Sequence, residues 1–172
     1  MGNVKTGNVR TDLVVVLHNI RSVHNVGSIF RTADAAGVKK IYLCGITPTP
    51  IDRFGRPRKD FTKVSLGAEK SVEWEKVSAR KINGLFRDLK SRKYEILAVE
   101  QSSRSTPYYK HSVYERSHIN GVALVLGNEV KGLPPSVLRR ADRVLEIPMR
   151  GKKESLNVSV AFGIVVFGLL YN

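Results

Sequence analysis

Two short apolar runs in the second half of the chain each lead directly into a polar loop. Residues 121–126 (GVALVL) run into residues 127–132 (GNEVKG), and residues 144–147 (VLEI) run into residues 148–157 (PMRGKKESLN). Unbroken apolar runs of this length favour strands that are buried on both faces, as in parallel sheets. Ligands of such sheets bind beyond the carboxyl ends of the strands. The two loops therefore predict a ligand site at one edge of a parallel sheet.

The rest of the chain alternates between similar apolar runs and helical patterns. Strands are predicted over residues 13–17, 41–44, 96–99, 121–126 and 144–147. Helices are predicted from an N-cap at Asn25 to Gly37, over residues 79–92, after Pro135, and from Ser155 onwards. This alternation predicts an α/β fold with a mostly parallel sheet and helices on both faces. The 172 residues are expected to form a single domain, 1–172, with a short N-terminal tail, 1–12.

The charge of the chain indicates its class of partner. It carries 29 Lys and Arg residues against 15 Asp and Glu residues, a formal net charge of +14. Such an excess favours a polyanionic partner, nucleic acid before an anionic membrane surface. The single cysteine, Cys44, excludes an internal disulfide, and the four histidines do not cluster with acids, so no metal site is predicted.

Membrane insertion and export are not predicted. The N-terminus lacks the apolar core of a signal peptide. The apolar run 158–171 is shorter than an ordinary membrane-spanning helix and is more typical of a buried helix. A cytoplasmic protein without a membrane partner is therefore expected.

Two long polar loops interrupt the alternation. The first, residues 47–63, is rich in Pro and Arg and places Phe54 among cations. Cations pair with phosphates and aromatic rings stack on bases, so this loop suits RNA. Its candidate contacts are Arg53, Arg56, Arg58 and Lys59. A solvated basic loop would explain the same composition. The second loop, residues 101–120, either covers a pocket or simply connects elements.

The first predicted helix carries two polar residues of interest. Arg31 lies opposite the apolar stripe of this helix, which consists of Val26, Ile29, Phe30 and Ala33. It therefore faces solvent or a ligand and not the local core. Considered alone, Arg31 would be explained as a solvated surface arginine and Asn25 as a plain N-cap.

Three segments taken together resemble the three motifs of the SpoU/TrmH family. They are residues 19–33, residues 126–133 and residues 147–161, in the order and with the spacing of the family. Members of this family are SPOUT-class RNA methyltransferases, which transfer a methyl group from S-adenosylmethionine to a ribose 2′-oxygen. The resemblance implies a C-terminal trefoil knot that forms the cofactor pocket. It also implies a homodimer with the last helix in its interface.

The resemblance further implies roles for individual residues. Arg31 matches the arginine proposed to activate the ribose hydroxyl, and Asn25 matches its partner in the first motif. Glu129 matches the acid of the second motif, and Ser155 and Asn157 match the polar pair of the third. Cofactor contacts are expected from Leu126, Gly127, Ile147, Met149 and Leu156. The glycine of this set is expected to let the backbone approach the ligand closely.

The leading prediction is an S-adenosylmethionine-dependent methyltransferase of a ribose 2′-hydroxyl in tRNA or rRNA. The alternatives are a base-modifying SPOUT methyltransferase and a non-catalytic RNA-binding module with the same fold. Arginine has a pKa above about 12 and is a poor base, so Arg31 either stabilises the developing alkoxide or anchors a neighbouring phosphate. Because the first predicted strand begins by Leu13, the chain resembles the short tRNA methyltransferases that modify the anticodon wobble ribose.

Overall fold

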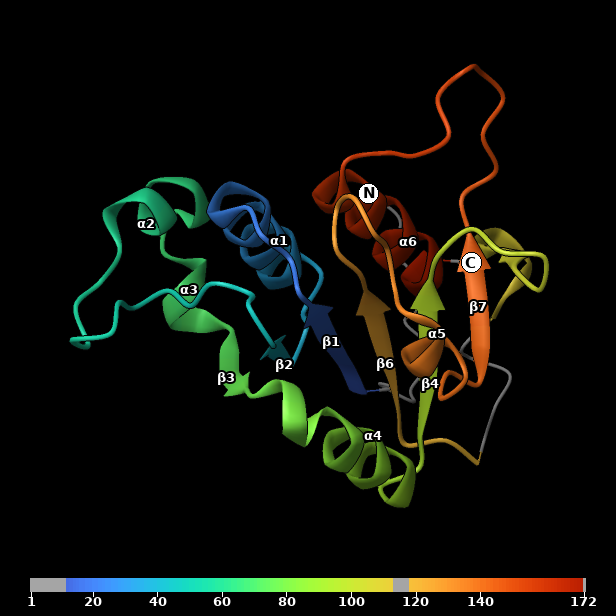
Figure 1. Ribbon diagram of the computed structural model, residues 1–172, viewed down its shortest axis with the longest axis horizontal. Helices are drawn as coiled ribbons and strands as arrows, with labels where there is room; N and C mark the ends of the chain where they lie inside the picture. Colours follow the sequence, from blue (N-terminus) through green and yellow to red (C-terminus); the bar gives the residue numbers. More distant parts are fainter. Residues whose placement is uncertain (1–11, 113–117, 172) are drawn as a thin grey trace, which may run out of the picture.

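A computed structural model describes residues 12–112 and 118–171 of the protein (Figure 1). These residues form one seven-stranded sheet in the order β3-β2-β1-β6-β4-β7-β5, and every pair of neighbouring strands is parallel. The strands are β1 (Asp12–His18), β2 (Lys40–Cys44), β3 (Glu73–Val77), β4 (Tyr94–Val99), β5 (Thr106–Pro107), β6 (Gly121–Leu126) and β7 (Arg143–Glu146). The sheet confirms the predicted α/β class.

Helices cover both faces of the sheet, as predicted. They are α1 (Val23–Ala35), α2 (Lys59–Ser65), α3 (Ala68–Ser71), α4 (Ile82–Ser91), α5 (Pro135–Leu138) and α6 (Val158–Tyr171), with 3₁₀ turns η1 (Ala79–Lys81) and η2 (Tyr108–Lys110). One apolar cluster joins the sheet to α1 and α6, and a second joins it to α4 and α5. Figure 1 shows α1 and α6 beside each other, well separated from α4.

The central strand β1 shows why its sequence is apolar without interruption. Leu13, Val15 and Leu17 pack into the cluster with α1 and α6. Val14 and Val16 point to the other side, into the cluster with α4. Successive side chains of a strand alternate between its faces, so a strand covered on both faces needs apolar residues at every position.

The strand order brings the two predicted loops to the same edge of the sheet. β6 lies between β1 and β4, and β7 pairs with the other side of β4. All of these strands are parallel, so residues 127–132 after β6 and residues 147–157 after β7 leave the sheet at one edge. The second of these loops extends well beyond the carboxyl end of β7 (Figure 1). The trefoil knot implied by the resemblance stays a prediction, as do the single domain and its tail.

Two predicted helix starts are wrong. α1 begins at Val23 and its N-cap is Ser22, whose Oγ accepts a hydrogen bond from the backbone N of Asn25 at 3.2 Å. Asn25 thus lies within the first turn, and its side chain is left for other contacts. α6 begins at Val158 and not at Ser155. Residues 147–157 form a loop because their polar side chains do not belong to the apolar surface of this helix.

The sequence reasoning missed the edge strands β3 and β5 and the short helices α2 and α3. In β3 only Val77 is buried, because a strand at the end of the sheet has a neighbour on one side only. Its charged residues therefore conceal the strand pattern. Residues 59–63 belong to α2, so the predicted loop 47–63 ends at Arg58. The predicted loop 101–120 contains β5 and η2, and its residues 113–117 lie outside the described residues.

Cys44 ends β2 and is completely buried, as expected for a cysteine that packs as a small apolar residue. Burial raises the pKa of its thiol to about 12. At pH 8 only about one thiol in 10⁴ would then be the reactive thiolate. We expect Cys44 to resist a thiol-specific chromogenic reagent in the native protein and to react within seconds after unfolding in guanidinium. Rapid reaction of the native protein would show that the end of β2 opens locally.

Candidate functional site

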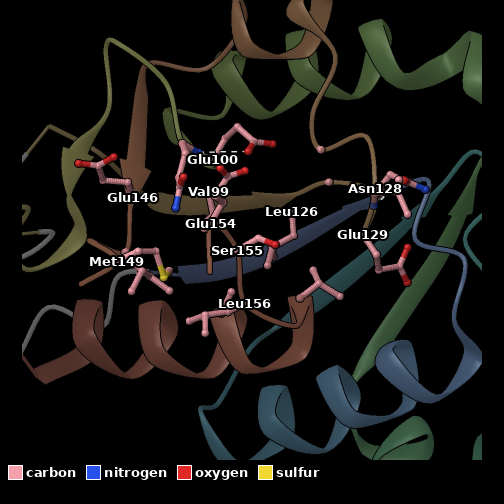
Figure 2. A pocket seen from close by; sticks show the side chains of 17 residues that line it. Val99, Glu100, Leu126, Asn128, Glu129, Glu146, Met149, Glu154, Ser155 and Leu156 are labelled. Carbon is pink, nitrogen blue, oxygen red and sulfur yellow. Dashed lines mark hydrogen bonds between the residues drawn. The ribbon is translucent and has the colours of Figure 1, made fainter. Parts of the chain in front are cut away.

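A pocket lies beyond the carboxyl ends of β4, β6 and β7, next to the start of α6. All five residues predicted to contact a cofactor line it, namely Leu126, Gly127, Ile147, Met149 and Leu156. Figure 2 shows Met149 at one end of the pocket and Asn128 and Glu129 at the other. The two loops that the sequence singled out therefore share one pocket, as their position after parallel strands predicts.

Asn128 holds the loop after β6 in shape. Its Nδ2 donates to the backbone oxygen of Asn19 at 2.8 Å, which ties the loop to the end of β1. Its Oδ1 accepts from the backbone N of Val130 and of Lys131, at 3.0 and 2.9 Å. The backbone N of Gly132 donates to the backbone oxygen of Asn128 at 2.9 Å and closes a tight turn. An asparagine after a strand is a signal of such side-chain-stabilised turns.

Gly127 has a structural reason to be glycine in addition to the predicted close approach to a ligand. A Cβ added to it would lie 2.5 Å from the carbonyl carbon of Gly132 and 2.6 Å from the backbone N of Leu133. The loop folds back onto residue 127, so a side chain would collide with backbone and not only with a ligand. The glycine shapes the wall of the pocket as well as leaving space in it.

Glu100, which the sequence reasoning missed, fixes the other end of the same loop. It follows β4 directly, and its Oε2 accepts from the backbone N of Leu133 at 2.8 Å. Gly132 has a φ of +63°, and a Cβ there would lie 2.2 Å from that Oε2. The signal for Glu100 was its place immediately after an apolar strand, the same signal that marked the loops after β6 and β7.

Glu129 connects the loop after β6 to the start of α1. Its Oε1 accepts from the backbone N of Ser22 at 3.0 Å, and its Oε2 from the backbone N of Arg21 at 3.0 Å. The Nδ2 of Asn25 donates to the same Oε1 at 3.0 Å. The backbone N–H groups at the start of a helix have no partner within the helix itself. A carboxylate at this end of α1 is also favoured by the helix dipole.

The same network continues to the third motif. The Nδ2 of Asn157 donates to the Oδ1 of Asn25 at 3.0 Å, and the Oδ1 of Asn157 accepts from the backbone N of Ser159 in α6 at 2.9 Å. Asn25, Glu129 and Asn157 therefore join α1, the loop after β6 and the start of α6. The structure brings together three of the five predicted catalytic residues in this network.

The remaining two predicted catalytic residues lie apart from the network. Ser155 lines the pocket. Arg31 is exposed on α1, beyond the residues that line the pocket, as its position opposite the buried stripe predicts. It is about 9 Å further along the helix axis than Asn25, at a rise of about 1.5 Å per residue. A group that Arg31 contacts would therefore approach from outside the pocket.

Hydrogen bonding sets the charge state of Glu129. Burial opposes ionisation, but the N–H groups of Arg21, Ser22 and Asn25 outweigh it and hold the pKa of Glu129 below its ordinary value of 4.5. The side chain is therefore a carboxylate at neutral pH. A carboxylate that already accepts hydrogen bonds from three N–H groups is a poor base, and its position suits a clamp between the loop and the helix.

This depressed pKa predicts how stability depends on pH. The contribution of Glu129 is fully present above about pH 4.5 and is lost as the pH falls through the lower pKa of the folded state. We expect Glu129→Gln to be less stable than the wild type at pH 7, because the glutamine NH₂ group would face N–H donors instead of accepting from them. The difference should shrink below pH 4.5 in urea unfolding experiments. A difference that is constant from pH 7 to pH 3 would contradict the clamp.

Three of the four residues predicted to bind RNA lie in the loop before α2, and two of these three are paired with acids. Arg56 forms a salt bridge with Asp52 at 2.8 Å, and Arg58 forms one with Asp60 at 2.9 Å. The guanidinium carbons of Arg53 and Arg56 lie 4.7 and 4.9 Å from the ring centroid of Phe54. Lys59 begins α2.

The described residues give two further observations on ligands and membranes. In 12–112 and 118–171 there is no group of three His, Cys, Asp or Glu side chains placed to hold a metal ion. Over the same residues, every helix is too short or too polar to cross a bilayer.

The chain is similar to known proteins over almost all of its length. It is 33% identical to the tRNA (guanosine(18)-2'-O)-methyltransferase of Aquifex aeolicus over 156 residues, which is 91% of this chain and 67% of that protein. Its structure matches an AdoMet-bound rRNA methyltransferase from Sinorhizobium meliloti with a TM-score of 0.79 and 27% identity. That match covers 92% of this chain and 55% of the other, so this chain spans about half of it.

A third similar structure has nearly the same length as this chain. It was solved in work on the 2-OH methylation of C/U34 on tRNA, and it matches with a TM-score of 0.70 and 27% identity. The match covers 93% of this chain and 95% of the other. The model of the SpoU rRNA Methylase family matches residues 12–167, which include the pocket and its hydrogen-bond network. The chain therefore belongs to the SpoU rRNA methylase family.

Proposed function

We propose that the protein transfers a methyl group from S-adenosylmethionine to a ribose 2′-hydroxyl of tRNA or rRNA. The observation that carries this proposal is the single pocket lined by all five predicted cofactor residues. Glu129 at its rim holds the helix that presents Arg31. The names of the similar proteins, which act on tRNA and rRNA, support the reaction type.

The lining of the pocket fits S-adenosylmethionine. Its apolar side chains, among them Leu126, Met149 and Leu156, suit the adenine ring. The carboxylates of Glu100, Glu146 and Glu154 also line the pocket and favour the positive charge of a sulfonium and the hydroxyls of a ribose. Leu156 is 40% exposed, so it remains accessible to a ligand that enters the pocket.

S-adenosylmethionine supplies an electrophilic methyl group, so the protein has little covalent chemistry to do. Its residues must hold the ribose oxygen in line with the methyl group, and positioning of this kind can supply about 7–11 kcal/mol of barrier reduction. When bound, S-adenosylmethionine would give its methyl group to the ribose oxygen and leave as S-adenosylhomocysteine, while the hydroxyl proton would pass to solvent. Glu129 fixes the helix that carries Arg31, and the guanidinium of Arg31 stabilises negative charge on the oxygen or holds an adjacent phosphate.

Calorimetric titration with S-adenosylmethionine and S-adenosylhomocysteine tests the cofactor site without a choice of RNA. We expect about one molecule bound per chain, with weaker binding to Leu156→Ala and unchanged binding to Val64→Ala, on the far side of α1.

Methyl transfer to unfractionated tRNA and rRNA then tests the reaction. A product whose backbone resists alkaline cleavage at the modified nucleotide identifies a 2′-O-methyl group. Methylation of a base would overturn the reaction, and RNA binding without cofactor binding would indicate a binding module.

We further propose that the protein is a homodimer joined through α6. This helix is apolar on all sides: Phe162, Val165 and Val166 pack into the core. Its other side is not fully covered and carries Val160, Ile164, Phe167 and Tyr171. An exposed apolar stripe of this length supports burial against an identical stripe.

Sedimentation of a variant tests the dimer. Phe167→Glu places a charge within the stripe and is expected to yield monomers. The matched control is Phe54→Glu, since Phe54 is an exposed aromatic residue on a distant loop. A wild-type protein that sediments as a monomer at micromolar concentration would overturn this proposal.

A further inference from the structure

A second set of hollows begins on the other side of the loop after β6. The first shares Asn128, Val130 and Gly132 with the cofactor pocket and extends to His18 and Arg21. A second hollow shares Asn19 and Ile46 with the first. A third shares Lys76 and Lys81 with the second and passes between β3 and α4. These adjoining hollows form a groove that follows the carboxyl ends of β6, β1 and β2 from the cofactor pocket and then turns along α4 towards Lys40, the first residue of β2.

Cations line this groove along its whole length. We call it the basic edge, and define it by Arg21, Lys131, Lys76, Lys81, Arg80 and Arg87. All six are exposed. The acids in the groove, Glu75 and Asp88, are paired with Lys40 and Arg92. Within 12–112 and 118–171 none of the six defining cations forms a salt bridge, so their charge is not neutralised within the described protein.

The chemistry of the groove matches a nucleic acid strand. Exposed, unneutralised cations in a row are suited to successive phosphates. Val130 and Ile46 also line the groove and are 81% and 65% exposed. Their side chains offer apolar surface to bases. The groove crosses from β6 to β3, three strand spacings or about 15 Å, which a stacked strand covers with about four phosphates at 3.4 Å each.

We propose that the RNA strand next to the reacting nucleotide lies along the basic edge. Its phosphates contact Arg21 and Lys131 near the cofactor pocket and Arg80, Lys81 and Arg87 further away. This inference rests on the proposed function, because it takes the reacting ribose to lie at the cofactor pocket. The basic edge is a different surface from the loop that contains Arg53 and Phe54, where two of the four predicted cations are already paired with acids.

RNA binding by the double variant Lys81→Ala/Arg87→Ala tests the basic edge. Binding of unfractionated tRNA is measured by fluorescence anisotropy between 50 and 300 mM salt, with S-adenosylhomocysteine present. Each lost phosphate contact should reduce the slope of log Kd against log salt by about 0.7–0.9, so the slope of the double variant should be lower by about 1.4–1.8. At low salt we expect its Kd to rise by about tenfold or more.

Two matched variants make the result specific. Arg104→Ala/Lys110→Ala removes two exposed cations beside β5, at the opposite end of the sheet, and should change Kd by less than about twofold. Lys81→Arg/Arg87→Lys keeps both charges and should bind as the wild type does. Equal affinity of Lys81→Ala/Arg87→Ala and the wild type would overturn the basic edge. Cofactor titration and methyl transfer by the wild type are separate readouts, so the proposed function can stand or fail independently.

Discussion

Replacing Arg31 by alanine is expected to slow methyl transfer by about 10²–10³-fold, the usual effect of removing one group that stabilises transition-state charge. The affinity for S-adenosylmethionine should stay within about twofold of the wild type. The reason is geometric: Arg31 is exposed on α1 and lies outside the residues that line the pocket. It can therefore act on the RNA and not on the cofactor. Single-turnover methylation and calorimetric titration measure the two effects.

Lys63→Ala is the matched control for Arg31→Ala, because Lys63 is an exposed cation on the neighbouring helix α2. It should methylate RNA at the wild-type rate. The kinetic form of the loss separates the two proposed roles of Arg31. A fall in kcat alone indicates stabilisation of the alkoxide, whereas a rise in KM for RNA indicates a phosphate contact. Unchanged turnover would remove Arg31 from the mechanism.

The second large effect is expected for Gly127→Ala, which should destabilise the fold and abolish cofactor binding. The new Cβ would meet the backbone of Gly132 and Leu133 at 2.5 and 2.6 Å, and backbone cannot rotate away as a side chain can. Overpacking of this kind costs about 1–3 kcal/mol and sometimes more. Relief requires the loop after β6 to move, and that loop forms one wall of the pocket. Urea unfolding and cofactor titration of the variant test both expectations.

Gly151→Ala provides the control for this change. Gly151 lies in the other loop of the site, and a Cβ there would meet nothing within 4 Å. This variant should unfold at the same urea concentration as the wild type and bind the cofactor equally well. If Gly127→Ala behaved in the same way, the loop would have to be held less tightly than its hydrogen bonds to Asn128 and Glu100 indicate.

Local sequence patterns predicted the framework of the site but not the contacts that hold it. Buried strands are recognisable because burial on both faces demands continuous apolar residues, and the positions of the loops follow from parallel strands. The hydrogen bonds of Glu129 to Arg21 and Ser22 join residues more than 100 positions apart. No pattern of neighbouring residues encodes such a contact. Asn25 illustrates the same limit, because its contact with Glu129, and not its helix propensity, explains its presence.

Edge elements were predicted less well for a related physical reason. β3 has four partly or fully exposed residues and one buried residue, so its sequence resembles a polar loop. Only its pairing with β2 makes it a strand. The backbone contact of Gly127 was also missed, because a glycine beside a ligand and a glycine beside returning backbone look alike in a sequence. The structure separates them through the positions of Gly132 and Leu133.

The central place of β6 in the sheet governs how the chain can reach this structure during synthesis. Asp12 in β1 pairs with Gly121 in β6, and Tyr94 in β4 pairs with the same residue. Until residue 126 has left the ribosome, β1 and β4 each present an unpaired, apolar edge. Such edges pair readily with other chains, and contacts so distant along the sequence form slowly. We therefore expect the nascent protein to be most prone to pairing with other chains just before β6 emerges.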